Sequence, residues 1–375
     1  MNKEERIKVL QDIIKIKSVN DNESEVVDYF AELFRKHGIE SEKVKYSESL
    51  VATYKKGDGK VLGVSRHEDV VAAGDEGEWK FPPFSAEIDG DKLYGRGSTD
   101  MKSGLAALAI AMIEIKEENT DINGTLKFMA TVGEEVGELG AEQLTKEGYA
   151  DDLDGLIIGE PTGPALIYTH KGSINYTIVS RGKSAHSSMP KEGINSIANM
   201  NEFVTRANAE MQEVTNKYKN DVLGETAHAI TIINGGDQVN SIPAVTTLQG
   251  NIRTIPEFDN GKVKAVLQRI VDDLNKREGF NLELIVDYDI YPVESKPDSE
   301  LIKVIQAVSK EELPVIGISL TTDAAAFTKA ENEFDVVIYG PGVEDLPHQV
   351  DEYMLVEDYL GMVDGYKVVY EEYLK

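Results

Sequence analysis

Two of the six histidines stand where a predicted strand gives way to a loop. His67 follows a predicted strand over residues 61–65, and His348 follows another over residues 334–339. In open α/β sheets the loops at the carboxyl ends of strands converge on a crevice in which ligands bind. Imidazole nitrogens at such a crevice are candidate metal ligands. A lone histidine in an acidic loop is more often a surface residue, so the chemistry depends on the neighbouring groups.

Acidic residues end two further predicted strands. Glu134 and Glu135 come directly after a strand over residues 126–132, and Glu160 follows a strand over residues 156–158. Adjacent side chains in an extended turn point in opposite directions, so one carboxylate can bind a metal ion while its neighbour faces a water or a substrate. Taken singly, each of these acids is more often a solvated loop residue.

A glycine-rich stretch over residues 95–104 contributes another carboxylate. Asp100 lies in it, at the predicted start of a helix over residues 101–117. The helix N-terminus favours the ionised form of Asp100, and an N-cap is the simpler interpretation. The stretch lacks the order of glycine, lysine and hydroxyl residues of a P-loop, which argues against a phosphate site. Asp69, two residues after His67, is close enough to accept the second N–H of a metal-binding imidazole.

Two histidines and three carboxylates form the ligand set of two zinc-like ions that share one bridging acid, an arrangement that activates water at neutral pH. The alternative from another class is a non-catalytic acidic protein that binds divalent ions diffusely. Oxygen-only calcium loops are disfavoured by the two histidines. Metal analysis distinguishes the two classes, because a co-catalytic site predicts two ions per chain that are lost slowly to a chelator.

The elements that must position these side chains fall into two predicted domains. At 375 residues the chain exceeds one ordinary core. Up to residue 171, short apolar runs alternate with helical patterns, which is typical of a sheet covered by helices on both faces. Residues 172–292 follow the order strand, helix, strand, strand, helix, strand of a ferredoxin-like unit. We therefore expect an α/β catalytic domain, residues 1–171 with 293–375, that carries an inserted ferredoxin-like domain.

The composition excludes several classes of function. Asp and Glu total 67 against 39 Lys and Arg, a formal charge of −28, so nucleic acid or an anionic membrane surface would repel the chain. The absence of cysteine excludes disulfides, thiolate zinc sites and cysteine nucleophiles. No stretch approaches the ~18 uninterrupted apolar residues of a membrane helix. We expect a cytoplasmic protein that binds neither nucleic acid nor membrane.

The motifs occur in the order and spacing of a known family, over nearly the whole chain. The sequence resembles the co-catalytic metallopeptidases and deacylases that include succinyl-diaminopimelate desuccinylase, acetylornithine deacetylase, aminoacylase and carboxypeptidase G. The resemblance implies a zinc-aminopeptidase-like α/β domain with a ferredoxin-like lid used for dimerisation. It also implies two Zn²⁺ ions per chain, with Co²⁺ or Mn²⁺ as alternatives. The implied ligands are His67 and Glu160 for one ion, Glu135 and His348 for the other, and Asp100 as the bridge.

The same resemblance implies the catalytic groups. Glu134 would act as general base and acid, and Asp69 would orient His67. His186, in the motif over residues 184–190, would reach across a homodimer into the partner's active site and polarise the scissile carbonyl. The peptide bond that follows the bridging Asp100 would be cis.

The resemblance also implies substrate contacts. Asn240 and Arg253 would hold the substrate, Arg253 by a forked pair of bonds to its carboxylate. The further contacts would be Lys171, Thr321, Thr322 and Glu344.

The length and the motif set look most like the desuccinylases of the family, which hydrolyse N-succinyl-LL-2,6-diaminopimelate to succinate and LL-2,6-diaminopimelate in lysine biosynthesis. Departures from their usual pattern fall in substrate contacts, namely at Lys171, Met189, Ala325 and Glu344. These departures keep the hydrolase interpretation and leave the acyl group and the amine open. The alternatives are an acetylornithine deacetylase-like enzyme, another N-acyl-amino-acid deacylase and a dipeptidase of the same family.

Overall fold

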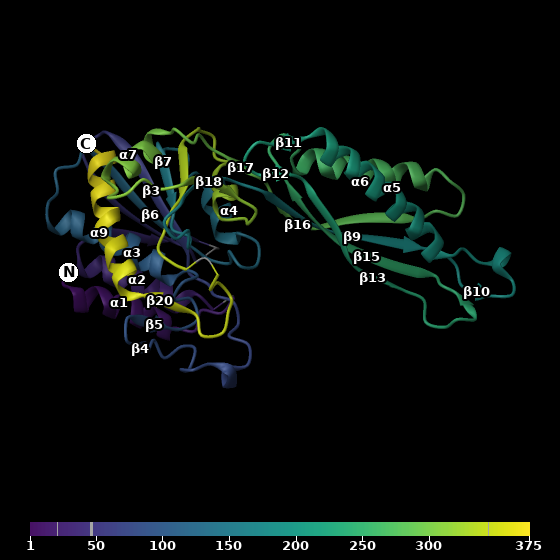
Figure 1. Cartoon of the computed structure of the whole chain (residues 1–375), viewed down its shortest axis with the longest axis horizontal. Coiled ribbons are helices and arrows are strands. Elements are labelled where there is room, and N and C mark those ends of the chain that lie inside the picture. The colour runs from purple at the N-terminus through teal and green to yellow at the C-terminus, as the bar shows by residue number, and fades with distance from the viewer. Residues whose placement is uncertain (21, 46–47, 344) are drawn as a thin grey trace. The chain divides into compact units, whose positions relative to one another are not determined.

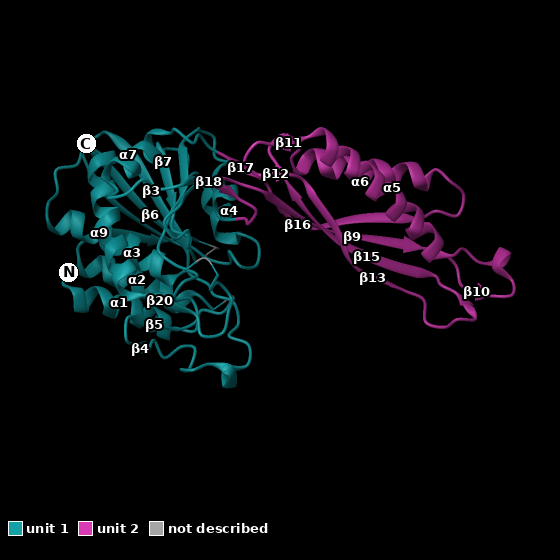
Figure 2. Cartoon of the chain, viewed as in Figure 1, with its two compact units in different colours: residues 1–168, 295–316, 322–375 teal, residues 169–294, 317–321 magenta. Residues whose placement is uncertain are grey.

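The computed structural model describes residues 1–20, 22–45, 48–343 and 345–375, which form two compact units (Figure 2). Unit 1 consists of residues 1–168, 295–316 and 322–375, and unit 2 of residues 169–294 and 317–321. The predicted boundaries, 171/172 and 292/293, lie within a few residues of these. The short segment 317–321 carried no signal in the sequence. The mixed α/β class predicted from the sequence is confirmed.

Among the described residues, most strands of a nine-stranded sheet belong to unit 1, and β17 belongs to unit 2 (Figure 1). Its central strands β6, β3, β7 and β19 run parallel to one another, so their carboxyl ends meet at one edge of the sheet. Strands β8 and β18 contain boundaries with unit 2. The order across the sheet is β1 (Glu40–Lys43), β2 (Leu50–Lys56), β6 (Gly124–Thr131), β3 (Lys60–His67), β7 (Gly155–Ile158), β19 (Asp335–Ile338), β8 (Leu166–His170) and β17 (Val293–Glu294), with β18 (Val315–Ile318) beside β8.

One helix forms the centre of the packing in unit 1. Helix α3 is buried from Lys102 to Ile115 and is apolar on most sides, which is the pattern of a helix enclosed in a core. It packs against α1, α9, β3 and β6. The helices of this unit are α1 (Lys3–Lys15), α2 (Ser24–Lys36), α3 (Lys102–Glu117), α4 (Leu139–Lys146), α7 (Glu300–Val308), α8 (Ala324–Phe327) and α9 (Val356–Tyr373), with the short 3-10 helix η1 (Glu76–Glu78).

The start of α2 differs from the sequence pattern. The spacing of Asn22 and Glu25 predicts a capping signal, but the N-cap residue is Glu23, whose side chain makes no capping hydrogen bond. Instead, the Asn22 side-chain amide donates to the carbonyl oxygens of Val19 and Asn20. The prediction is wrong because the asparagine closes a turn in the preceding loop, the local hydrogen bond that competes with capping.

A small antiparallel sheet joins two distant segments of unit 1. Its strands are β4 (Ile88–Asp89), β5 (Lys92–Tyr94) and β20 (Tyr353–Leu355), in the order β20, β5, β4. Strand β5 leads into the glycine-rich stretch that contains Asp100, and β20 follows the loop that contains His348. Because Tyr353 pairs with Tyr94, these two loops lie side by side.

Unit 2 has a sheet and a core of its own. Four antiparallel strands stand in the order β13, β15, β9, β16, and their buried side chains, such as Tyr176 and Leu248, share one cluster with Phe203 of α5 and Leu267 of α6. The elements follow one another as β9 (Gly172–Arg181), α5 (Ser196–Lys217), β13 (Ala227–Gly235), β15 (Val245–Thr254), α6 (Asn260–Asn275) and β16 (Leu282–Ile290). Shorter elements are β10 (Ala185–His186), η2 (Pro190–Glu192), β11 (Lys219–Asn220), β12 (Gly224–Glu225) and β14 (Ser241–Ile242).

Candidate metal centre

The parallel strands of unit 1 deliver most of the candidate ligands to one edge of the sheet. His67 is the last residue of β3, and Glu134 and Glu135 follow the end of β6 at Thr131. Glu160 follows β7 in the same way, and the loop after β19 contains His348. The sequence predicted these positions because each strand end is marked locally by the end of an apolar run.

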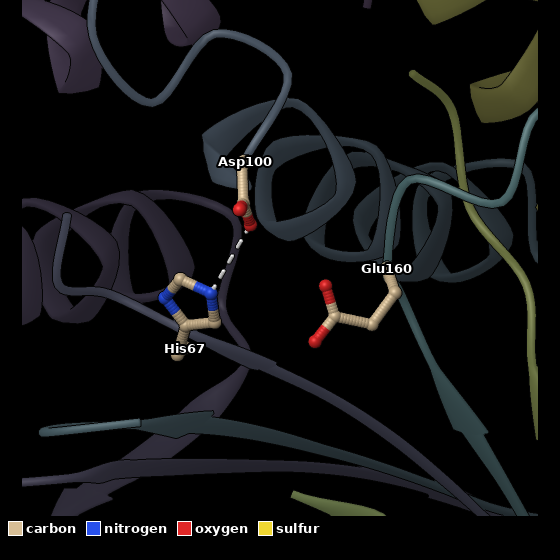
Figure 3. A group of neighbouring side chains, drawn as sticks. All are labelled: His67, Asp100 and Glu160. Atoms are coloured by element: carbon tan, nitrogen blue, oxygen red, sulfur yellow. Dashed lines mark ion pairs between the residues drawn. The ribbon is translucent and has the colours of Figure 1, made fainter. Parts of the chain in front are cut away.

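One group of side chains consists of His67, Asp100 and Glu160, and their carboxylate and imidazole groups point toward a common space (Figure 3). One ligand atom from each lies within 4.8 Å of the others. The distance from His67 Nε2 to Asp100 Oδ1 is 3.6 Å. The peptide bond Asp100–Met101 is cis, as the family resemblance implied.

A second group consists of Asp100, Glu135 and His348. His348 Nε2 lies 3.0 Å from Glu135 Oε1 and 3.4 Å from Asp100 Oδ2. Asp100 therefore directs Oδ1 toward His67 and Oδ2 toward His348. A carboxylate with one oxygen toward each group has the geometry of a bridge between two ions.

A third combination of the same side chains also meets the distance criterion for a metal ion. It consists of His67, Glu134 and Glu135, and the distance from Glu134 Oε2 to His67 Nε2 is 3.9 Å. Distance alone does not distinguish a base from a ligand at this position. The predicted role of Glu134 as a base therefore stays a prediction, and metal analysis of a Glu134 variant separates the two roles.

The buried imidazole of His67 provides a test of whether the donors suit a metal ion. Its Nδ1 lies 2.9 Å from the carbonyl oxygen of Asp69, which can only accept, so Nδ1 carries a proton and Nε2 is the nitrogen left for another partner. Nε2 is buried and makes no hydrogen bond within the described part of the chain. A buried ring nitrogen that faces carboxylates fits a divalent cation that takes nitrogen and oxygen ligands.

Asp69 connects the end of β3 to the turn after β6. Its carboxylate accepts the backbone N–H groups of Glu134 and Glu135, at 3.1 and 3.0 Å, and its Oδ1 lies 3.4 Å from His67 Nδ1. Burial raises the pKa of Asp69, but these contacts outweigh burial and lower it. Asp69 thus fixes the two glutamates in addition to lying beside His67, which the sequence did not indicate.

Glu352 and Arg96 form a buried ion pair that sequence reasoning missed. Glu352 accepts the backbone N–H groups of Gly97, Thr99 and Asp100, at 3.1, 2.8 and 2.9 Å, and Arg96 Nη1 at 2.6 Å. Arg96 also donates to the carbonyl oxygen of His348 at 3.3 Å. The pair therefore ties the loop of Asp100 to that of His348. No local pattern marks Glu352, because its partners lie about 250 residues away in the sequence.

Arg66 is the second residue that the sequence did not single out. Its side chain is fully buried, with Nη2 at 3.1 Å from Asp100 Oδ1 and Nη1 paired with Glu160 Oε1. Side chains of neighbouring residues in a strand point to opposite faces of the sheet. Because Arg66 is next to His67, its side chain would be expected to point away from the metal centre. At the strand end, however, carboxylates approach from two sides, and a long guanidinium side chain reaches both.

Burial and local charge separate the pKa values of the acids. Burial raises the pKa of Glu134 well above its ordinary value, and it raises the pKa of Glu160 to about 7 against the opposing charge of Arg66. Burial has the same tendency at Asp100, but attraction to His67 and Arg66 outweighs it, and the pKa of Asp100 is lowered to about 2. Asp100 is therefore ionised at neutral pH. The pKa of Glu134 is shifted in the opposite direction, because burial is the largest influence there.

Comparison with known proteins agrees with a metal-dependent hydrolase. A family model described as peptidase family M20/M25/M40 matches residues 63–372. The chain belongs to this family. Within the described residues, the helices include none that is long and apolar enough to cross a membrane.

Relatives of known name span the chain from end to end. A protein of Staphylococcus epidermidis named probable succinyl-diaminopimelate desuccinylase is 38% identical over 405 residues, which cover 100% of this chain and 99% of the relative. An M20 family metallo-carboxypeptidase from Sulfolobus solfataricus has a similar fold, with a TM-score of 0.83 at 21% identity over 100% of this chain and 99% of that one. A dinuclear metal binding M20 peptidase of Bacillus subtilis gives a TM-score of 0.74 at 15% identity over 99% and 98% of the two chains.

Some of the residues predicted to contact the substrate belong to unit 1 and others to unit 2. Those of unit 2 form two sets that lie in separate places along its strands and loops. His186 is exposed on β10, with Nδ1 at 2.8 Å from Ser188 Oγ, and Asn240 is exposed in the loop before β14. Ser187 N donates to the carbonyl oxygen of Asn240 at 3.0 Å, so His186 and Asn240 lie in adjoining segments.

Lys171 and Arg253 form the other set of unit 2. Lys171 Nζ donates to the carbonyl oxygen of Glu225 at 2.6 Å. Burial lowers the pKa of Lys171, the charge of Glu225 opposes this shift, and the nearby charge of Arg253 adds to it. Two cationic side chains at one place fit an anionic group of a substrate. Their role stays a prediction.

The remaining predicted contacts fall at a unit boundary or outside the described residues. Thr321 is the last residue of the segment assigned to unit 2, and Thr322 is buried in unit 1. Thr322 Oγ1 accepts the backbone N–H of Ala324 at 3.3 Å, at the start of α8. This contact gives Thr322 a structural role in addition to the predicted one. Glu344 lies outside the described residues.

Proposed function

We propose that this M20 chain is a divalent-metal-dependent amidohydrolase that cleaves N-succinyl-LL-2,6-diaminopimelate into succinate and LL-2,6-diaminopimelate. The observation that carries the reaction class is the position of Asp100, whose two oxygens face His67 and His348. The name of the full-length Staphylococcus relative supports the substrate. The reaction adds water across the amide, so the water oxygen joins the succinyl carbonyl carbon and the nitrogen leaves as an amine.

The proposed cofactor is a pair of Zn²⁺ ions, with Co²⁺ or Mn²⁺ as alternatives. His67 and Glu160 would hold one ion, Glu135 and His348 the other, and Asp100 both. Nitrogen and carboxylate donors without thiolates suit these metals. When bound, such ions lower the pKa of water and polarise a carbonyl oxygen.

Glu134 is the proposed acid–base group. It lies mostly buried beside His67, and burial raises its pKa, which makes its carboxylate a stronger base. It would take a proton from the attacking water and return it to the leaving amine. Asp69 holds the backbone of Glu134, which fixes the direction of this carboxylate. Removal of the Glu134 carboxylate is therefore expected to stop proton transfer without removing a metal ion.

Charged and polar side chains are the proposed substrate contacts. A succinyl group and the amino-acid ends of diaminopimelate carry carboxylates, for which Arg253 and Lys171 supply positive charge. Asn240, Thr321, Thr322 and Glu344 are the further proposed contacts.

We further propose that unit 2 is a ferredoxin-like lid through which two chains form a homodimer, with His186 acting in the partner's site. The antiparallel order β13, β15, β9, β16 supports the fold. Strand β13 is an edge strand, and Ile232 and Ile233 on it are 47% and 57% exposed. An exposed apolar edge strand is a template for pairing with another chain. Sedimentation at micromolar concentration is expected to give twice the monomer mass.

The experiment that tests the function is a substrate panel on the full-length, metal-loaded protein. Hydrolysis of N-succinyl-diaminopimelate is measured against N-acetylornithine and a set of dipeptides, and metal content is measured in the same preparation. We expect two ions per chain and the highest kcat/KM for the succinyl compound. A higher kcat/KM for acetylornithine or a dipeptide would show that the chain has another activity of the family and not the proposed one. Variable, salt-sensitive metal content without hydrolysis would indicate the non-catalytic acidic protein.

A further inference from the structure

Arg66 places a fixed positive charge among the groups that would receive a metal ion. The side chain is fully buried, and its guanidinium pairs with Asp100 Oδ1 at 3.1 Å and with Glu160 Oε1. Both carboxylates belong to the group around His67. Arginine is not deprotonated in proteins, so this charge persists at every working pH.

The guanidinium has few other partners. Among the described residues its ion pairs go to Asp100 and Glu160, and its Nε makes no hydrogen bond. A divalent cation at this group would need the same carboxylate oxygens. It would also meet a like charge a few ångströms away in a buried place, where salt screens little.

The second group has a different electrostatic environment. The arginine near His348 is Arg96, and its charge is paired with Glu352 at 2.6 Å. The oxygens that face this group, Asp100 Oδ2 and Glu135 Oε1, are directed at the His348 imidazole. No arginine among the described residues pairs with either of these two oxygens.

We propose that Arg66 competes with the metal ion at the His67–Asp100–Glu160 group and makes it the weaker of two unequal sites. The Asp100–Glu135–His348 group then fills first, and the first-named group fills only as the free metal concentration rises. This inference rests on the proposed metal-dependent function. It adds a regulatory consequence, because the fraction of doubly loaded enzyme follows metal supply.

Equilibrium dialysis of the metal-free, full-length protein against Zn²⁺, with metal quantified per chain, tests the proposal without an activity assay. The protein without substitutions is expected to bind Zn²⁺ in two separate steps, the second of them at the His67–Asp100–Glu160 group. Arg66→Gln is expected to tighten the second step by about tenfold or more, because it removes a like charge a few ångströms from the ion in a buried place. Arg66→Lys keeps the charge on a shorter side chain and is expected to tighten it less.

A matched control is Arg6→Gln, which removes another guanidinium from an ion pair in unit 1, with Glu114, outside the centre. It is expected to leave both steps unchanged. His348→Ala removes a ligand of the tighter group, so the binding step that remains in this variant is the weak one. Adding Arg66→Gln to His348→Ala is expected to tighten that remaining step. This double variant assigns the step to the His67 group.

The outcomes separate this inference from the proposed function. Absence of stoichiometric binding in the unchanged protein would overturn the proposed function. Two ions bound with equal affinity, or weaker binding in Arg66→Gln, would overturn only the role of Arg66, the latter by showing that it holds the ligands in place. If Arg66→Gln does not fold by circular dichroism, Arg66→Lys decides, and a second step no tighter than in the unchanged protein overturns the inference.

Discussion

Unit 1 and unit 2 present their candidate functional residues differently. In unit 1, His67 and Asp69 are almost fully buried, His67 contacts Asp69, and Asp69 accepts the backbone N–H groups of Glu134 and Glu135 from the turn after β6. In unit 2, His186 and Asn240 are exposed, and their hydrogen-bonding partners, Ser188 and Ser187, lie in adjoining segments. The difference indicates that unit 1 can organise a reaction centre by itself. We expect the exposed groups of unit 2 to act only when another surface covers them.

The sharpest test of this difference is Glu134→Gln in unit 1. We expect turnover to fall by more than the ~10²–10⁴-fold of acid–base catalysis, because the carboxylate also orients the water. Metal content is expected to stay at two ions per chain, which elemental analysis measures. The adjacent Glu135→Gln is the matched control and is expected to lose one ion. Loss of an ion from Glu134→Gln would make Glu134 a ligand, as the third group of side chains allows.

The corresponding change in unit 2 is His186→Ala. If the imidazole stabilises the developing oxyanion, kcat is expected to fall by about 10²–10³-fold with unchanged metal content. Mixing this variant with Glu134→Gln tests the partner. A mixed dimer in which His186 acts across the interface contains one complete site, so activity is expected to return. A mixture as inactive as its components would place His186 in its own chain's site or outside catalysis.

Glu352→Gln tests whether the centre depends on the loops behind it. The substitution keeps the size of the side chain and removes the charge that pairs with Arg96 and accepts N–H groups of the Asp100 loop. Metal affinity is expected to fall by about 10–100-fold, measured by dialysis. Glu357→Gln is the control, because Glu357 is 75% exposed and pairs with Lys3 at the surface. Equal affinity in both variants would show that the Glu352 contacts are dispensable.

The smallest expected effect concerns the stability of unit 1 rather than its chemistry. Burial raises the pKa of Glu114, but hydrogen bonds from Arg6, Lys367 and the N-terminal amine outweigh it and lower the pKa to about 2. A carboxylate whose folded pKa lies below its unfolded pKa stabilises the fold above the unfolded value. That contribution is lost as the pH falls from about 4.5 toward 2.

Glu114→Gln is therefore expected to lower the free energy of unfolding at pH 7 by about 2 kcal/mol, since it leaves buried cations without their partner. The deficit is expected to shrink as the pH falls from about 4.5 toward 2, which urea unfolding over this pH range measures. A deficit that is independent of pH would show that packing, not charge, carries the effect.

The amino-acid sequence by itself determined which residue types stand at which strand ends. His67, Glu134, Glu135 and Glu160 follow apolar runs that mark β3, β6 and β7, and parallel strands bring such ends to one edge. This information is local, because a run of apolar residues predicts a strand and the next polar residue predicts its end. Local patterns also mislead, as the capping motif at Asn22 shows, where the side chain bonds to nearer carbonyls.

Only the tertiary structure decided how Asp100 meets His348 and why Arg66 belongs to the centre. The first depends on the pairing of β5 with β20 and on the Glu352 carboxylate, both of which join segments about 250 residues apart. The second depends on Asp100 and Glu160 approaching the end of β3 from two other elements. Contacts between distant segments follow from sheet order and packing, which no periodicity within one segment encodes.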